Sequence, residues 1–386
     1  MAAQRAFKPV NTALKAKNYK EAVNQVNKLR QDSLYKNDAQ LCLYSMEAYK
    51  GLNDGENTKL YLKRSYDTVA FFNTTLQIVQ EAARLDSIRR NLEQENKNAP
   101  AKWQKTSVSY LQRYFPNLHP GAIFFYQRKK YPEAMSYLRT CIDLPQTETG
   151  KAAQLTNRLA VIQSSLYLTA AFNSKNYAEV HRYEQQALED SASRATVMEC
   201  LTYTAEAEND TAQYRHWLQE GMAAYPQHTL FFTRLADLYA SRRDFTSVLH
   251  IAQTQLERDS TDVSALAGRC MAQLNLVRLD DCITTGQLLL QADSTNTEAH
   301  YYIGAAYVGK AAQVELPLGV STNKYRKALQ QQQSLYRQAE TYLEAYRKLA
   351  PQAQKRWAPL LYKVYLALNE GDKFAEIEKM LQWLNE

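Results

Sequence analysis

RATVMECLTYTAEAEND begins at residue 194, HTLFFTRLADLYASRRD at residue 228, DVSALAGRCMAQLNLVRLD at residue 262 and NTEAHYYIGAAYVGKA at residue 296. Each of these segments starts 34 residues after the one before it. A constant step of this length predicts a row of similar helix pairs, in which each pair packs only on its neighbours. The scarcity of helix breakers, 11 Gly and 10 Pro in 386 residues, favours the same all-helical reading.

Two columns of the repeat predict where the helices of a pair pack together. One column is apolar and holds Leu201, Leu235 and Ile303. The next column is small, because a bulky side chain between two closely crossing helices would push them apart. It holds Thr202, Ala236, Cys270 and Gly304, and three positions later stand Ala205, Tyr239, Gln273 and Tyr307.

The second helix of a pair has its own sequence cue. It reads NYKEA at residues 18–22, KYPEA at 130–134, NYAEV at 176–180 and, more loosely, DFTSV at 244–248. Together with Leu235-Ala236-x-x-Tyr239, these motifs resemble the tetratricopeptide repeat (TPR) family. The resemblance implies an all-α fold, a right-handed α-α superhelix (TPR solenoid) of about nine to ten helix pairs. Asp-Ser pairs, such as Asp86-Ser87 and Asp259-Ser260, are expected to cap the helices that follow them.

The repeat is uneven along the chain. Residues 70–115 read as one long amphipathic helix followed by a second helix that ends before Pro116. An insertion interrupts the pair that begins near residue 297, with a helix expected from Asn323 and a short apolar loop, 314–320, that either packs on the next pair or docks onto a partner. The expected organisation is 1–69 as N-terminal TPR-like pairs, 70–115 as an irregular long-helix segment, 116–193 as further TPR-like pairs, and 194–386 as the regular array with an insertion at about 310–333 and a C-terminal capping pair.

The chemistry that the sequence offers is sparse. No motif for a nucleotide loop, a metal protease or a hydrolase nucleophile is present, so no catalytic residue, metal ligand or cofactor is predicted and the chain is not expected to be an enzyme. The net charge of +7 is scattered and mostly matched, which argues against nucleic acid as a partner. No apolar run is long enough to span a membrane. Cys270 and Cys282 occupy facing small columns and could touch, either as reduced packing residues or as a disulfide.

In a solenoid of this kind the first helix of each pair lines a concave groove. The side chains between the packing columns then form the candidate partner-binding surface, and their mixture of Tyr, Arg, Met and acidic residues is typical of recognition surfaces. These residues are Glu199, Tyr203, Glu206, Thr233, Arg234, Asp237, Ser241, Met271, Asn275, Tyr301, Tyr302 and Val308.

The expected function is a non-catalytic scaffold that binds a protein or peptide partner in this groove. The alternative is a glycan- or nutrient-capturing surface protein, similar to starch-binding lipoproteins that also carry helix repeats. FFNTTL (71–76), RYFPNL (113–118) and GAIFF (121–125) resemble exported TPR proteins of Bacteroidetes bacteria, and Ala2-Ala3-Gln4 resembles what remains beside a signal-peptidase site. The expected location is therefore the periplasm or cell envelope, with an ordinary cytoplasmic start as the alternative.

Overall fold

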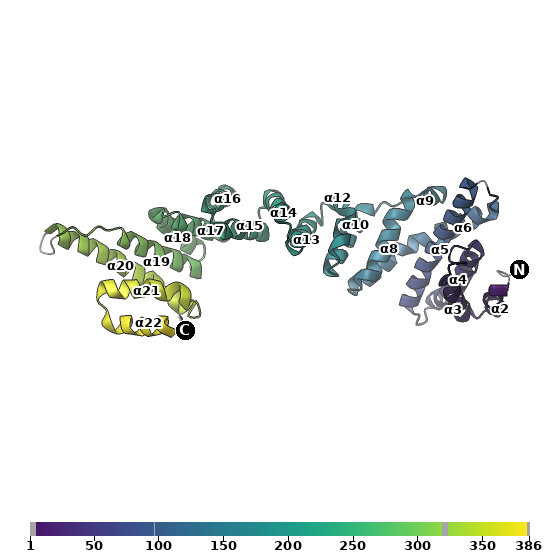
Figure 1. The fold of residues 1–386 in the computed structure, drawn as a ribbon, viewed down its shortest axis with the longest axis horizontal. Helices are drawn as coiled ribbons and strands as arrows, with labels where there is room; N and C mark the ends of the chain where they lie inside the picture. The colour runs from purple at the N-terminus through teal and green to yellow at the C-terminus, as the bar shows by residue number, and fades with distance from the viewer. Residues whose placement is uncertain (1–4, 96, 319–322, 384–386) are drawn as a thin grey trace. The chain divides into compact units, whose positions relative to one another are not determined.

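The computed structural model describes residues 5–95, 97–318 and 323–383, and all regular secondary structure in these ranges is helical (Figure 1). The predicted all-α fold is confirmed. The chain divides into two compact units, residues 1–210 and 211–386. The boundary between the two units falls inside the stretch that repeats with a constant step. Periodicity reports how each helix pair is built, whereas the compact units depend on which helices pack together.

Unit 1 is a series of helices that pack mainly on near neighbours along the chain. Its helices are α2 (Lys8–Lys15), α3 (Tyr19–Arg30), α4 (Ala39–Tyr61), α5 (Thr68–Gln94), α6 (Ala101–Tyr114), α7 (Leu118–Gln127), α8 (Tyr131–Asp143), α9 (Glu148–Ala152), α10 (Ala160–Asn173), α11 (Tyr177–Val180), α12 (Glu184–Ala187) and α13 (Arg194–Ala207), with 3-10 turns η1 (Phe115–Asn117), η2 (Leu144–Gln146) and η3 (His181–Tyr183).

Unit 2 is more regular. Its helices are α14 (Thr211–Ala224), α15 (Thr229–Ser241), α16 (Phe245–Arg258), α17 (Val263–Asn275), α18 (Leu279–Ala292), α19 (Thr297–Ala312), α20 (Asn323–Leu349), α21 (Gln354–Leu368) and α22 (Gly371–Trp383). Within it α15 pairs with α16, α17 with α18, α19 with α20 and α21 with α22.

The turn inside a helix pair is built the same way in both units. The first helix ends on a residue in the left-handed conformation, with φ of 54° to 58°, and the next residue donates its backbone N–H to the carbonyl five positions back, a helix-ending motif that satisfies otherwise unpaired carbonyls. These left-handed residues include Lys17, Lys129, Lys175, Arg243, Val277 and Asn369. In two of these turns the residue that follows caps the second helix: Asn18 accepts from the N–H of Glu21, and Asp244 from that of Ser247.

The packing columns predicted from the repeat are buried. Leu201, Leu235 and Ile303 have no exposed surface, and Thr202, Ala236 and Cys270 are buried in the small column. Gly304 shows why the column must be small, because a Cβ there would lie 2.7 Å from Leu343 of α20. Helix contact through small residues is therefore a real feature of this array.

Cys270 and Cys282 do meet, as expected from the columns. The Sγ of Cys282 lies 3.5 Å from the carbonyl oxygen of Cys270, and both side chains are fully buried free thiols.

The Asp-Ser pairs do not cap the helices that follow them, which corrects the sequence interpretation. Asp259 instead accepts hydrogen bonds from Thr261 in the turn, and Asp262 caps α17. Asp86 lies inside α5 and is 1% exposed. A capping residue is defined by its position relative to the first helical turn, which the dipeptide alone does not reveal.

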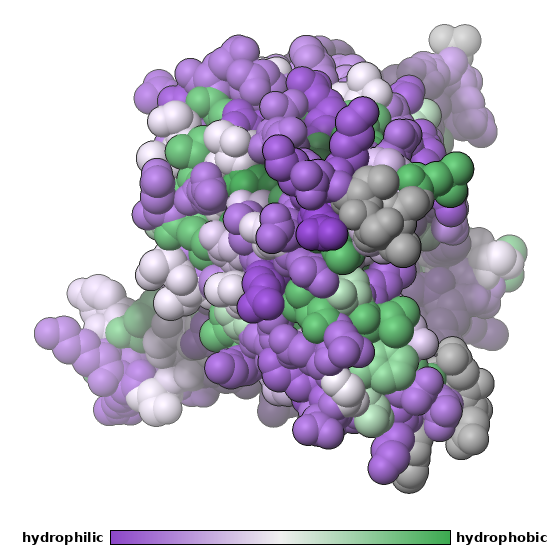
Figure 2. All heavy atoms as spheres, turned by 90° about the vertical axis from the view of Figure 1, so that its left-hand side faces the viewer, coloured by the Kyte–Doolittle hydropathy of each residue, from purple (hydrophilic) through white to green (hydrophobic). Residues whose placement is uncertain are grey.

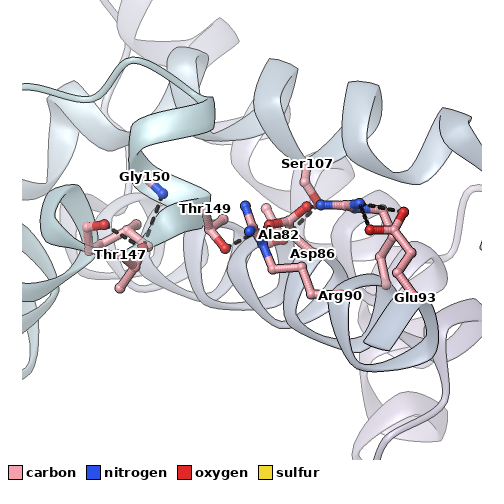
Figure 3. A network of polar contacts seen from close by, with 10 residues as sticks. Ala82, Asp86, Arg90, Glu93, Ser107, Thr147, Thr149 and Gly150 are labelled. Carbon is pink, nitrogen blue, oxygen red and sulfur yellow. Dashed lines mark hydrogen bonds and ion pairs between the residues drawn. The ribbon is translucent and has the colours of Figure 1, made fainter. Parts of the chain in front are cut away.

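Residues 70–115 form the long helix and second helix that the sequence predicts, α5 and α6, and a polar network joins this region to α9 (Figure 3). The Asp86 carboxylate accepts from Arg89 at 2.9 Å, from Arg90 at 2.7 Å and from the Thr149 hydroxyl at 2.7 Å. Ser107 of α6 donates to the carbonyl of Ala82 at 2.8 Å. A buried carboxylate is tolerated because it is both paired and hydrogen-bonded.

The insertion of unit 2 differs in part from its prediction. α20 begins at Asn323 and ends at Leu349, as expected. The described part of the apolar loop does not pack on the next pair, since Leu316 is 39% and Leu318 is 100% exposed, and residues 319–322 lie outside the described ranges. Figure 2, which faces the C-terminal side of Figure 1, shows hydrophilic side chains over most of that surface and apolar ones in small separate groups.

The sequence analysis did not predict a third irregularity. In the pair that begins with α10, the second helix is split into α11, η3 and α12. The second helices of two later pairs, α16 and α18, are unbroken. His181 of η3 lies between two carboxylates, with Nδ1 2.7 Å from Glu184 and Nε2 3.4 Å from Glu208, just beyond the end of α13. The break thus lies between α10 and α13, beside the pocket described next.

Candidate binding pocket

Unit 1 contains an open pocket of about 630 Å³ between the first helices of its later pairs. α7, α10 and α13 supply most of its lining, and α11 adds Tyr177 at the start of the broken helix. The lining residues are Tyr126, Thr169, Phe172, Asn173, Tyr177, Thr196, Glu199, Cys200, Tyr203, Glu206 and Ala207.

The register of the helix pairs explains why these side chains converge. Tyr126, Phe172 and Glu206 each stand three residues before the left-handed residue of their turn, which is Lys129, Lys175 and Asn209 respectively. Thr169 and Tyr203 stand one helical turn earlier, six residues before the same point. Positions three apart share a helix face, so stacking the pairs brings these columns together.

Aromatic rings form much of the pocket wall. Phe172 stacks with Tyr203 at a centroid distance of 6.2 Å and an interplanar angle of 29°, and it also meets Tyr177 at 6.4 Å. Tyr126 approaches Thr169, with its hydroxyl 2.9 Å from Oγ1. The rings are half-buried, so each still presents surface that a ligand can cover.

The pocket offers recognition groups rather than reactive ones. Burial raises the pKa of the Cys200 thiol to about 12, so the sulfur is protonated at neutral pH and is a poor nucleophile. Burial also raises the pKa of the Tyr126 hydroxyl. Within the described residues no group of three His, Cys, Asp or Glu side chains could hold a metal ion. Of the described helices, none is long and apolar enough to cross a bilayer.

The predicted surface residues are distributed over both units. Glu199, Tyr203 and Glu206 all line the pocket of unit 1. In unit 2, Thr233, Arg234, Asp237, Ser241 and Asn275 are exposed on α15 and α17, and Met271 is half-buried. Two predictions need correction, since Tyr302 and Val308 are only 8% and 5% exposed and belong to the packing of α19 with its neighbours.

Tyr301 of α19 is already engaged within unit 2. The guanidinium of Arg356 from α21 lies 3.9 Å from its ring centroid and 5.4 Å from that of Tyr346. The same guanidinium donates two parallel hydrogen bonds to Glu298, at 2.6 and 2.8 Å. A carboxylate and two aromatic rings therefore enclose one arginine of the chain itself.

Sequence reasoning missed Tyr126, Phe172 and Tyr177, although a signal for them exists. Tyr126 and Phe172 both stand five residues before the aromatic that opens the second helix, in YQRKKY and FNSKNY. This aromatic column lies before residue 194, where the repeat is less regular and its columns are harder to recognise.

Comparison with known proteins finds similarity only at low sequence identity. No protein-family model matches this sequence, and no curated protein matches it. Similar solved structures include the C-terminal part of a TPR repeat-containing protein from Cytophaga hutchinsonii, with 10% identity, coverage of 67% of this chain and 92% of that one, and a TM-score of 0.44.

Two other solved structures extend that comparison. YrrB, described as a TPR protein with an unusual peptide-binding site, has 16% identity over 52% of this chain and 98% of its own, with a TM-score of 0.33. Yeast Tom70 has 11% identity over 90% of this chain and 88% of its own, with a TM-score of 0.31.

Proposed function

We propose that this protein is a non-catalytic scaffold that binds an extended segment of a protein partner in the pocket of α7, α10, α11 and α13. The observation that carries the proposal is the group of half-buried aromatic side chains that α7, α10, α11 and α13 bring together in this pocket. Rigid aromatic rings supply large contact area at low entropic cost, which is why they dominate protein-recognition sites.

The test is a selection of random peptides displayed on phage against the full chain, followed by fluorescence anisotropy with the enriched peptides. We expect Phe172→Ala to weaken their binding by about tenfold, because it removes one wall of the pocket and the stacking partner of Tyr203. Tyr61→Ala is the matched control, since it removes an aromatic ring that is 86% exposed outside the pocket. Enriched peptides that bind both variants equally well would contradict the proposal.

The alternative function is capture of a glycan in the same pocket. Aromatic rings beside polar side chains such as Asn173 and Glu206 can also bind a sugar. A glycan array probed with the full chain distinguishes the two functions. Binding of glycans that is lost in Phe172→Ala, with no peptide enriched in the selection, would replace the scaffold proposal with glycan capture.

We also propose that the scaffold works in the periplasm or cell envelope. The support is the sequence resemblance stated above, since nothing in the fold depends on the compartment. Fractionation of the native organism, with an antibody against this chain, tests the location. Recovery in the cytoplasmic fraction alone would overturn it.

A further inference from the structure

We infer that one edge of unit 1 binds the surface of a membrane that contains anionic lipid. This edge is formed by the α4–α5 turn, residues 62–67, and the α7–α8 turn, residues 128–130. It is separate from the pocket, and the inference does not depend on the proposed function. Three observations carry it: exposed apolar side chains at the end of α4, exposed basic side chains in both turns, and contacts that hold the two turns at one edge.

The apolar side chains close α4. Leu60, Tyr61 and Leu62 are consecutive, and they are 42%, 86% and 51% exposed. The described ranges contain no other run of three large apolar side chains that are all exposed. Single exposed apolar residues are ordinary, whereas a group of them marks a surface that meets another molecule or a membrane. We call residues 60–64, which end in Lys63 and Arg64, the hairpin tip.

The hairpin tip projects beyond the helix pair before it. Gly51 of α4 meets Tyr19, the first residue of α3, since a Cβ at Gly51 would lie 2.4 Å from the Tyr19 ring. From Gly51, α4 continues to Tyr61, which is about 15 Å of helix. Apolar side chains on such a projection can enter the boundary between lipid headgroups and acyl chains, where Tyr and Leu are favoured.

The α7–α8 turn lies at the same edge of unit 1. Phe72, near the start of α5, contacts Phe124, near the end of α7, with ring centroids 5.4 Å apart. Phe71 extends this contact toward the α4–α5 turn, since it lies 5.4 Å from Phe72 and 6.4 Å from Tyr66. The four half-buried rings thus connect the two turns, so unit 1 can present both turns to one flat surface.

Both turns carry exposed positive charge. In the first turn Lys63 and Arg64 follow the apolar side chains, and the second turn consists of Arg128, Lys129 and Lys130. All five residues are exposed, and the described part of the chain contains no ion pair to any of them. A bilayer that contains anionic lipid attracts such a group of cations over about one Debye length, roughly 10 Å.

The acidic side chains of the hairpin are engaged by its own helices. Glu56 accepts from Lys59 at 2.6 Å and from the backbone N–H of Asp67 at 2.8 Å. Asp67 caps α5 by accepting from the N–H of Ala70 at 2.9 Å. The two basic residues of the hairpin tip therefore remain available to an anion outside the protein.

The apolar side chains favour a membrane over another anionic partner. A nucleic acid could pair with the basic turns, but it would leave Leu60 and Leu62 in water. An anionic bilayer has charged headgroups above an apolar layer, so it matches both kinds of side chain in the hairpin tip.

The test is co-sedimentation of the full chain with vesicles. One set contains only phosphatidylcholine, and the other contains equal amounts of phosphatidylcholine and phosphatidylglycerol. We expect binding to the mixed vesicles to be about tenfold stronger and to weaken as salt is raised, because the basic turns meet anionic headgroups. Equal binding to both sets would contradict the inference.

Variants of the apolar side chains test insertion. Tyr61→Ser combined with Leu62→Ser should weaken binding to the mixed vesicles about tenfold, because it removes the apolar contact with the bilayer. Leu276→Ser combined with Val277→Ser is the matched control, since it removes an exposed apolar pair at a turn of unit 2 and should have no effect.

Variants of the basic side chains test the charge. Lys63→Glu combined with Arg64→Glu should weaken binding to the mixed vesicles about tenfold. Lys102→Glu combined with Lys105→Glu changes the net charge equally, but at exposed positions of α6, which begins at the opposite end of α5. This control should weaken binding less than about twofold, and an equal loss in both variants would overturn the inference.

A fluorescent label shows directly whether the hairpin tip enters the bilayer. Leu62→Cys can be labelled selectively with an environment-sensitive fluorophore, because the five native cysteines are buried. We expect the emission to shift to shorter wavelength with the mixed vesicles. Sedimentation without this shift would overturn insertion of the apolar side chains.

The remaining outcomes also decide the inference. Absence of sedimentation with the mixed vesicles overturns it, and binding of a single-stranded oligonucleotide that requires Lys63 and Arg64 would then assign this edge to nucleic acid. Phe172→Ala should bind vesicles like the unchanged protein, so the pocket and the membrane edge can fail independently. Circular dichroism of each variant shows that a loss of binding is not a loss of fold.

Discussion

The pocket of unit 1 and the Glu298–Tyr301 face of unit 2 stand at matching positions of the same repeat, but they are used differently. In unit 1 the face borders an open pocket of about 630 Å³. In unit 2 it holds Arg356, a residue contributed by α21. The difference shows that one repeat position can border an open pocket in one unit and pack against a later helix of the chain in the other.

The surroundings of the two faces differ as well. Unit 1 contains the long helices α4 and α5, the α5–α9 polar network and the broken helix α11–η3–α12. Unit 2 from α15 to α18 is a regular succession of helix pairs. The open pocket thus occurs in the part of the chain where the repeat is least regular, and the following changes test what each departure contributes.

The largest effect is expected in the network of unit 1. Asp86→Ala removes the buried carboxylate that Arg89, Arg90 and Thr149 share, while Arg89 keeps its contact with Glu93, and should lower the free energy of unfolding by about 2–3 kcal/mol. Urea unfolding followed by circular dichroism measures this loss. Asp86→Asn is the matched control: it keeps an acceptor for Thr149 and should lose less. Equal stability of Asp86→Ala and the unchanged protein would mean that the network does not stabilise the fold.

The next effect concerns the filled face of unit 2. Arg356→Ala removes the paired hydrogen bonds to Glu298 and the contact with Tyr301, and because both charged groups are partly exposed we expect a loss of about 1–2 kcal/mol. Urea unfolding followed by circular dichroism measures this loss. A variant as stable as the unchanged protein would show that the contact of Arg356 with Glu298 and Tyr301 does not stabilise unit 2.

A smaller change is expected at a turn of unit 2. Val277 is a β-branched residue with φ of 58°, a conformation that disfavours such side chains, and it is 61% exposed. Val277→Gly should raise the free energy of unfolding by about 1 kcal/mol, since the relief of strain exceeds the entropy that glycine loses. Thermal unfolding of the variants measures this gain. Arg243 stands at the equivalent turn but is not β-branched, so Arg243→Gly should gain less stability than Val277→Gly.

The smallest effect is the dependence of unit 1 on pH through His181. Burial lowers its pKa, but hydrogen bonds and charge from Glu184 and Glu208 outweigh this and raise the pKa above its ordinary value. The interaction of protonated His181 with these two carboxylates therefore stabilises the folded state. This contribution is present at pH below the pKa of His181 in the unfolded chain and is lost as pH rises through its pKa in the folded protein. The side chain is 44% exposed, so we expect less than about 1 kcal/mol.

The check on His181 is a comparison of stability at pH 6 and pH 8. His181→Gln should remove part of the pH dependence, while His250→Gln, on an exposed position of α16, should leave it unchanged. Burial lowers the pKa of His119, so this residue changes stability with pH in the opposite direction. The quantity to measure is therefore the difference in pH dependence between His181→Gln and the unchanged protein. A pH profile unaltered in His181→Gln would rule out this contribution.

Much of the array could be predicted because its rules are local. The 34-residue step, the buried Leu201 column and the small column at Gly304 depend on helix periodicity and on how closely neighbouring helices cross, and both leave a mark on residue types. The helix from Asn323 was predictable for the same reason. Pocket residues Glu199, Tyr203 and Glu206 followed once the packing columns had been identified.

By itself, the sequence determined the helix pairs, their register and which face of each first helix would be polar or aromatic. Only the tertiary structure decided that Asp86 is a buried acceptor, that Tyr302 is packed away and that Arg356 fills the face at Tyr301. The reason is physical: periodicity records the faces of a single helix, whereas the group that covers a face comes from residues far away in the sequence. Arg356 and Glu298 are 58 residues apart, and only folding brings them together.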